Sequence, residues 1–185
     1  MAIRVAGIAG SLREGSLNKG LLRAAVELAP AGMEIHIYNR LGDIPPYNDD
    51  VFQRGDPEPV TDMKAFIGGA DAMLIVTPEY NYGVPGVLKN AIDWASRPSG
   101  KSVLNRRPTA IMGASSGLGG TIRAQHALRQ TFVFTDTYVM PQPEIKIPSA
   151  APLFDASVKL VDENTRQHVI KFLQAFAGWI ARFTN

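Results

Sequence analysis

Three glycine-rich segments carry most of the side chains that could bind a ligand. The first, residues 10–18, reads GSLREGSLN and offers serine hydroxyls, a guanidinium and an amide just before a predicted helix. Donors placed at a helix start favour a phosphate group. The alternative is a plain strand-to-helix turn in which a serine only caps the helix. The residues that we expect at an anion site here are Ser11, Leu12, Arg13, Ser16 and Asn18.

Two other anion-binding motifs can be tested against this segment. A P-loop requires GxxxxGK[ST]; Gly10 and Gly15 have that spacing, but Ser16 and Leu17 replace the required Lys and Ser/Thr. A Rossmann fingerprint requires GxGxxG, and residues 7–10 lack the first close glycine pair. A P-loop-like nucleotide binder is therefore a remote alternative.

The second segment, residues 77–86, reads TPEYNYGVPG. Its prolines stiffen the backbone, its glycines allow close approach, and its tyrosines offer flat apolar surface. An isoalloxazine ring needs such packing together with hydrogen bonds to its polar edge. The residues expected to contact a ring are Pro78, Glu79, Tyr80 and Asn81. The alternative is an aromatic-rich turn that packs on its own domain.

The third segment, residues 113–120, reads GASSGLGG. Its N–H groups can contact the edge of a ring, and its openness would leave room for a nicotinamide. We expect Ser115 and Gly117 to take part, whereas the alternative is a flexible loop made permissive by glycine.

Strand-like and helix-like runs alternate along the chain and must position these segments. We predict one α/β domain over residues 1–185, a flavodoxin-like three-layer sandwich with a five-stranded parallel sheet in the order 2-1-3-4-5. The predicted strands are 3–9, 33–38, 72–77, 109–113 and 138–140, the last extended by 144–147. The predicted helices are 18–28, 60–69, one that starts near Pro85, 121–134 and 162–184, and a loop covers 41–59. Ligands of such sheets bind outside the carboxyl ends of the strands.

Composition narrows the choice of function. The chain has no cysteine, and its three histidines lack metal-ligand spacing, so we expect no metal site. A net charge of +2 without a run of Lys or Arg does not suggest nucleic-acid binding. No segment has the pattern of a signal peptide or the length of a membrane span, so we expect a cytoplasmic protein.

The motifs at residues 10–18 and 78–94 (PEYNYGVPGVLKNAIDW) resemble those of the NADPH-dependent FMN reductase family, most closely its bacterial chromate/quinone reductase branch. The resemblance continues through residues 128–130 (LRQ) to 143–144 (PE). It implies that Ser11, Arg13, Ser16 and Asn18 bind the FMN phosphate, and that the ring lies against residues 78–81. One departure is the loop at 115–120, which is shorter than in some members of that family.

The resemblance also implies an enzyme in which NADPH or NADH reduces bound FMN, followed by ping-pong transfer to quinones; chromate, ferric complexes and free flavins are additional candidate acceptors. Hydride transfer through flavin N5 needs no catalytic side chain. A homodimer or homotetramer with FMN near the subunit boundary is implied as well. Its expected contacts are Asn90, Asp93, Trp94, Arg123 and His126.

Two other flavin-based functions remain as alternatives. One is an electron carrier of the flavodoxin type, although such carriers are typically strongly acidic and this chain is at +2. The other is the flavin-supplying reductase of a two-component monooxygenase. In the last predicted helix, Phe172, Phe176, Trp179 and Phe183 recur at helical spacing, which indicates core packing and not a cofactor site.

Overall fold

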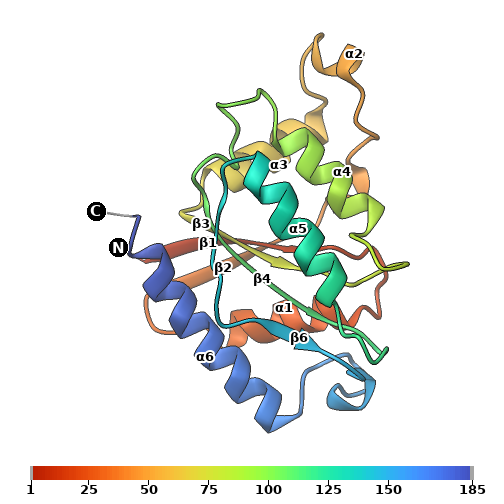
Figure 1. Cartoon of the computed structure of the whole chain (residues 1–185), viewed down its shortest axis with the longest axis vertical. Coiled ribbons are helices and arrows are strands. Elements are labelled where there is room, and N and C mark those ends of the chain that lie inside the picture. Colours follow the sequence, from red (N-terminus) through yellow and green to blue (C-terminus); the bar gives the residue numbers. More distant parts are fainter. Residues whose placement is uncertain (1, 184–185) are drawn as a thin grey trace.

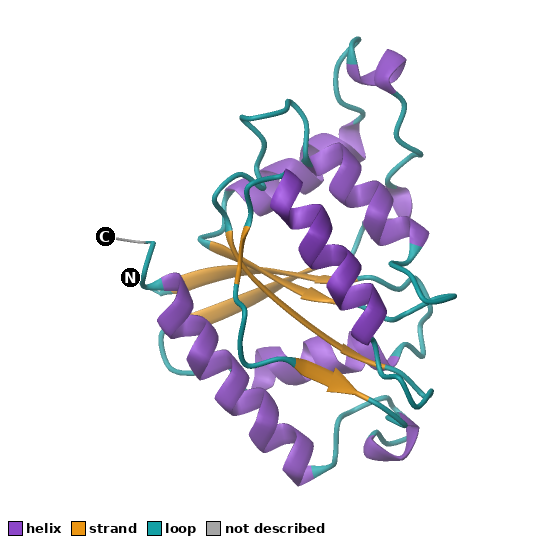
Figure 2. Cartoon of the chain, viewed as in Figure 1, coloured by secondary structure: helices purple, strands orange, loops and turns teal. Residues whose placement is uncertain are grey.

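A computed structural model describes residues 2–183 and is built around one parallel sheet with helices on both faces (Figures 1 and 2). The sheet order is β2-β1-β3-β4-β5, with β6 also pairing with β4, so the predicted flavodoxin-like order is confirmed. The strands are β1 (Ile3–Ala9), β2 (Met33–Tyr38), β3 (Ala72–Val76), β4 (Pro108–Ala114), β5 (Tyr138–Val139) and β6 (Ile145–Ile147).

The central strands β3 and β4 are buried along their whole length. Both faces of a parallel sheet are covered by helices, which is why these strands read as continuous apolar runs without alternation. The register places Val76 of β3 beside Ala9 of β1 and beside Met112 of β4. These three strands therefore end at the same edge, and the loops that follow them start close together.

The fifth strand is divided into two pieces, as its predicted extension suggested. β5 pairs with the start of β4 through Tyr138 and Val139, and β6 pairs with its end through Ile145 to Ile147. Between them stand Pro141 and Pro143, which have no N–H to donate to a ladder. The chain therefore leaves the sheet after β5 and returns to it at Ile145, where β6 begins.

Helices cover the two faces of the sheet in unequal sets. On one face, α1 and α6 pack against Val5, Leu74 and Met112; on the other, α3, α4 and α5 pack against Ile8, Ile75 and Ile111. The α-helices are α1 (Leu17–Glu27), α2 (Asp49–Phe52), α3 (Glu58–Gly68), α4 (Gly86–Ala95), α5 (Ile122–Phe134) and α6 (Glu163–Ile180), and the 3-10 helices are η1 (Leu41–Asp43) and η2 (Ala151–Leu153). Within residues 2–183, none of these helices is long and apolar enough to cross a membrane.

Two predicted boundaries were wrong. The predicted loop at 41–59 contains η1 and α2, and α3 begins two residues before the predicted start, with Pro59 in its first turn where a missing N–H costs nothing. The last helix ends at Ile180, and the predicted end at Thr184 lies outside the described residues. The aromatic stripe of α6 is core at Phe172 and Phe176, as predicted, whereas Phe183 is partly exposed.

Candidate cofactor site

The loops after β1, β3 and β4 surround a cavity of about 190 Å³ at the carboxyl edge of the sheet. It lies where strand order reverses, between β1 and β3, which is the usual ligand position in such sheets. All three glycine-rich segments contribute to its wall. The residues that line it are Ser11, Arg13, Ser16, Leu17, Asn18, Pro78, Glu79, Tyr80, Ala114, Ser115 and Ser116.

Three of the expected site residues do not line this cavity. The side chain of Leu12 borders a second cavity of about 320 Å³, beyond the first loop and beside Tyr38 and Leu41. Asn81 and Gly117 lie on the loops that surround the cavity, but outside its wall. Any part that these three residues play must be through backbone groups or through movement of the loops.

At the first loop, the structure places two serine hydroxyls and the Arg13 guanidinium at the cavity wall. Ser11 and Ser16 are only 3% and 4% exposed, and Arg13 is exposed at the rim. The Ser16 hydroxyl accepts from the N–H of Lys19 at 3.4 Å, so Ser16 is also the N-cap of α1. The first N–H groups of α1 have no acceptor within the helix and face this end of the cavity. The anion-site and N-cap interpretations of Ser16 are therefore compatible.

Asn18 has a different environment from the one expected. Its Nδ2 donates to the carbonyl of Ala114 and its Oδ1 accepts from the N–H of Ala114, both at 2.9 Å. The side chain is 3% exposed. Asn18 thus connects α1 to the end of β4, and a direct bond to a phosphate would have to use the remaining capacity of its amide.

The second loop ends in a two-residue hairpin. Tyr80 and Gly83 exchange both backbone hydrogen bonds, at 3.1 and 2.9 Å. Between them, Asn81 and Tyr82 have φ of 50° and 63°, the left-handed pair that a tight hairpin turn requires. Such a backbone is strained for tyrosine, and strain of this kind is often found at binding sites. The hairpin exposes the ring of Tyr82, at 72%.

Hydrogen bonds also join the second loop to the first, and the third loop to the segment that contains β6. The Tyr80 and Ser11 hydroxyls lie 3.1 Å apart and join the second loop to the first. The N–H of Ser115 donates to Ile147 at 3.0 Å, and the N–H of Ala150 donates to Ser115 at 2.9 Å. Together with the bonds of Asn18 to Ala114, these contacts join segments of the cavity wall before any ligand binds, which lowers the ordering cost of binding.

Some residues of this region were not singled out from the sequence, and one was placed wrongly. Ser116 lines the cavity beside Ser115. The expected interface contact Trp94 is fully buried within the chain, where its indole N–H donates to Pro45 at 2.8 Å and its ring packs on Tyr47. Asn90 also bonds to this segment, through the N–H of Tyr47 at 2.7 Å. Because Trp94 and Asn90 bond to residues that are distant in sequence, only the fold could reveal these contacts.

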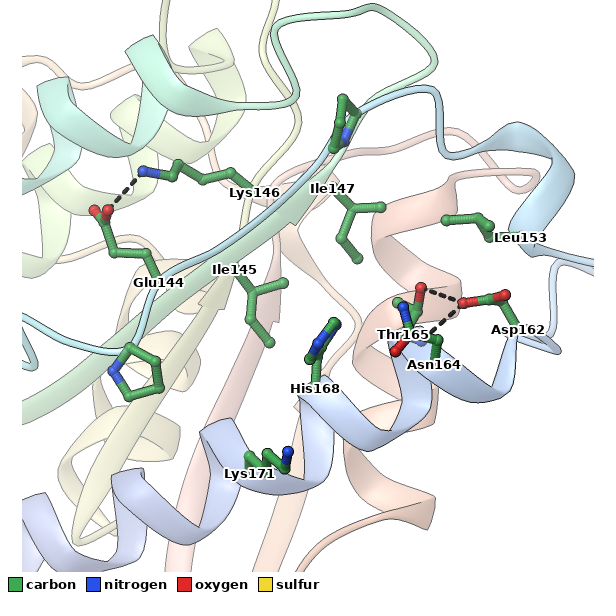
Figure 3. A pocket seen from close by; sticks show the side chains of 12 residues that line it. Glu144, Ile145, Lys146, Ile147, Leu153, Asp162, Asn164, Thr165, His168 and Lys171 are labelled. Carbon is green, nitrogen blue, oxygen red and sulfur yellow. Dashed lines mark hydrogen bonds and ion pairs between the residues drawn. The ribbon is translucent and has the colours of Figure 1, made fainter.

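A larger groove of about 630 Å³ lies elsewhere, between β6 and the first turns of α6 (Figure 3). Lys146 pairs with Glu144 at 2.5 Å and lowers the pKa of that carboxyl, and Asp162 accepts from Thr165 at the start of α6. Figure 3 shows these two pairs on opposite sides of β6. His168 and Lys171 of α6 also line the groove, which shares no lining residue with the three glycine-rich segments. Within residues 2–183, no cluster of three or more His, Asp or Glu could hold a metal ion.

Comparisons with known proteins bear on this site. A model of the NADPH-dependent FMN reductase family matches residues 3–152. An NAD(P)H-dependent FMN reductase of Pseudomonas aeruginosa is 48% identical over 180 residues, 97% of this chain and 96% of its own length. A quinone reductase of Pseudomonas putida is 46% identical over 95% of this chain and 94% of its own. The solved structure of FerB, an NAD(P)H:(acceptor) oxidoreductase flavoenzyme from Paracoccus denitrificans, has a TM-score of 0.88 and 39% identity, and covers 98% of both chains.

The fold and the three converging loops define a flavodoxin-like protein with a cavity, lined by hydroxyl and guanidinium groups, at the switch point of its sheet. The chain belongs to the NADPH-dependent FMN reductase family. It is an NAD(P)H-dependent oxidoreductase with FMN as its cofactor, which excludes the electron-carrier alternative.

Proposed function

We propose that this enzyme oxidises NAD(P)H and reduces quinones through FMN held in the cavity formed by the three loops. The observation that carries the proposal is that one cavity is lined by a loop rich in hydrogen-bond donors and by a loop with proline and tyrosine side chains. FMN has a dianion at one end and a flat heterocycle at the other, which would suit these two loops. The quinone reductase relative supports the choice of acceptor. Chromate, ferric complexes and free flavins are further acceptors that we propose for the same site.

The donor set of the cavity fits FMN. Ser11, Arg13 and Ser16 would hold the phosphate together with the start of α1, and the backbone of Leu12 would add to them. Pro78 and Tyr80 would face the ring, with backbone groups of Glu79, Asn81, Ser115 and Gly117 at its polar edge. Asn18 would act mainly by holding the third loop in place, because Ala114 already occupies both ends of its amide.

When bound, FMN supplies a two-electron acceptor for the hydride of NAD(P)H and a donor to the second substrate. The chain's part is then to bind and orient the two substrates in turn on the open side of the cavity, as a ping-pong reaction requires. No acid–base pair is needed for this. The ionisable side chains in the cavity wall are Arg13, Glu79 and Tyr80. The carboxylate of Glu79 is turned toward α5.

The size of the cavity supports assembly into a homodimer or homotetramer. At about 190 Å³ it is smaller than the roughly 300–1,000 Å³ of common ligand sites, so one chain would cover FMN only in part. Exposed apolar side chains lie on the surrounding loops, at Tyr82 (72%) and Leu118 (91%), and at the start of α5, at Ile122 (36%). A second copy that packs on them would complete the wall around the ring. We further propose that the protein is cytoplasmic.

The test is steady-state turnover of the FMN-loaded protein. NADPH and NADH oxidation would be followed with and without 1,4-benzoquinone. We expect quinone to accelerate the consumption of NAD(P)H and to be converted to hydroquinone. Double-reciprocal plots of initial velocity, with one substrate varied at several fixed concentrations of the other, should give parallel lines. A holoenzyme that consumes NAD(P)H no faster with quinone than with oxygen alone would contradict the proposal.

A further inference from the structure

Helix α5 begins without a cap of its own. Its N-cap residue Thr121 makes no capping hydrogen bond, because its hydroxyl instead accepts from Gln125 at 2.8 Å. The first N–H groups of a helix have no partner within the helix and must find one elsewhere when they are shielded from water. For α5, the partner comes from a different part of the chain.

That partner is the carboxylate of Glu79, in the second loop of the cofactor site. One oxygen accepts from the N–H of Arg123 at 2.8 Å and from the N–H of Ala124 at 3.1 Å. The other lies 3.3 Å from the Arg123 guanidinium. The Glu79 side chain is only 8% exposed. A carboxylate in this position is stabilised by the helix dipole as well as by the hydrogen bonds.

A second contact joins the same helix turn to the far end of the hairpin. The guanidinium of Arg123 stacks on the ring of Tyr82, 3.8 Å from its centroid. Arg123 is half exposed, so its ion pair with Glu79 is weak by itself. The two capping bonds of the largely shielded Glu79 carboxylate are therefore the stronger attachment, and the stacked Arg123 extends it to Tyr82.

We propose that Glu79 is a positioning residue for flavin binding: its carboxylate caps α5 and thereby holds residues 78–83 where the ring would lie. This inference rests on the proposed FMN site. Glu79 was expected to contact the ring, but here it acts through the loop backbone. The cap also directs its negative charge to the helix and leaves backbone donors for the polar edge of the ring, where negative charge develops when flavin is reduced.

The experiment compares Glu79→Ala and Glu79→Gln with a matched control, Asp162→Ala. Asp162 caps α6 through the N–H of Thr165 at 2.7 Å and its hydroxyl at 2.6 Å, away from the cavity wall. FMN affinity is measured by quenching of flavin fluorescence, and amide hydrogen exchange is measured in the FMN-free protein. We expect Glu79→Ala to weaken FMN binding about tenfold or more, since charge-assisted hydrogen bonds are lost, and to speed exchange at Tyr80 and Gly83.

The other two variants separate positioning from general destabilisation. Glu79→Gln keeps a neutral acceptor for the helix N–H groups, so FMN affinity should recover to within about threefold of the wild type. Asp162→Ala should lower the urea midpoint and leave FMN affinity and hairpin exchange unchanged.

Unchanged affinity in Glu79→Ala, or equal loss in Asp162→Ala, would overturn the inference. A wild-type protein that binds no FMN would refute the proposed function instead, and exchange at Tyr80 and Gly83 in the FMN-free variants would still decide whether Glu79 holds the hairpin.

Discussion

Replacement of Asn18 by Ala should destabilise the protein far more than replacement of an exposed asparagine by Ala. The substitution removes two buried hydrogen bonds of 2.9 Å and leaves the N–H and carbonyl of Ala114 without their partners at the end of β4. A net hydrogen bond is worth about 1 kcal/mol, and an unsatisfied buried group costs about 1–3 kcal/mol. Since water can reach part of the space left by the amide, we expect a loss of about 2–4 kcal/mol in the free energy of unfolding.

The assay is urea unfolding of the FMN-free protein at one fixed concentration, followed by circular dichroism. Asn105→Ala is the control, because it removes a single exposed bond of 3.2 Å to Asp136 and should change stability by no more than about 0.5 kcal/mol. FMN affinity should also fall in Asn18→Ala, because the third loop loses its attachment to α1. If both variants unfold at the same urea concentration, the bridge between α1 and β4 is not stabilising and the reasoning is refuted.

Two further substitutions test the close packing and the electrostatics of the fold. In Gly113→Ala, a Cβ would overlap the Thr77 carbonyl and the Thr121 hydroxyl, so we expect the free energy of unfolding in urea to fall by at least about 1–3 kcal/mol. The control Gly86→Ala adds a Cβ that faces open space and should be nearly neutral. Equal stability of the two variants would contradict the close packing at Gly113. Burial raises the pKa of Tyr38 from 10.0 to about 12, with Asp62 adding to the effect. The folded state favours the neutral phenol, so this contribution is complete below pH 10.0 and is lost as pH rises toward 12. The pKa of Tyr47 is raised as well, so the test compares phenolate absorbance titrations of the wild type and Tyr38→Phe. The phenolate missing from the variant should be one that forms near pH 12, and a missing phenolate that forms near pH 10.0 would refute the assignment.

The convergence of the three loops could be predicted because parallel strands end at one edge and short helical crossovers keep their order. The glycine and hydroxyl content of residues 10–18 predicted an anion site there, and the structure places Ser11, Arg13 and Ser16 in the cavity wall. These features are local in sequence or follow from topology. For the same reason, the two-piece fifth strand could be anticipated from the apolar runs on either side of Pro141 and Pro143.

The side-chain attachments could not be predicted, because their partners are distant in sequence. Asn18 bonds to a residue 96 positions away, and Glu79 bonds to one 44 positions away. A polar residue in a ligand-binding motif gives no sign of whether its side chain faces the ligand or the scaffold. The prediction that Trp94 lies at a subunit interface was wrong for a related reason. An aromatic residue beside the apolar stripe of a helix can pack either at an interface or inside its own chain, and Trp94 is buried inside the chain, where it bonds to the carbonyl of Pro45.

The most direct test of the central claim compares the affinities of FMN and riboflavin, which lacks the phosphate, for the wild type and for Arg13→Gln. If residues 10–18 hold the phosphate, the wild type should prefer FMN by about 100-fold or more, as two charge-assisted hydrogen bonds would provide. Arg13→Gln should weaken FMN binding and leave riboflavin binding nearly unchanged. Equal affinities for the two flavins in the wild type, or a preference that Arg13→Gln leaves intact, would contradict the account.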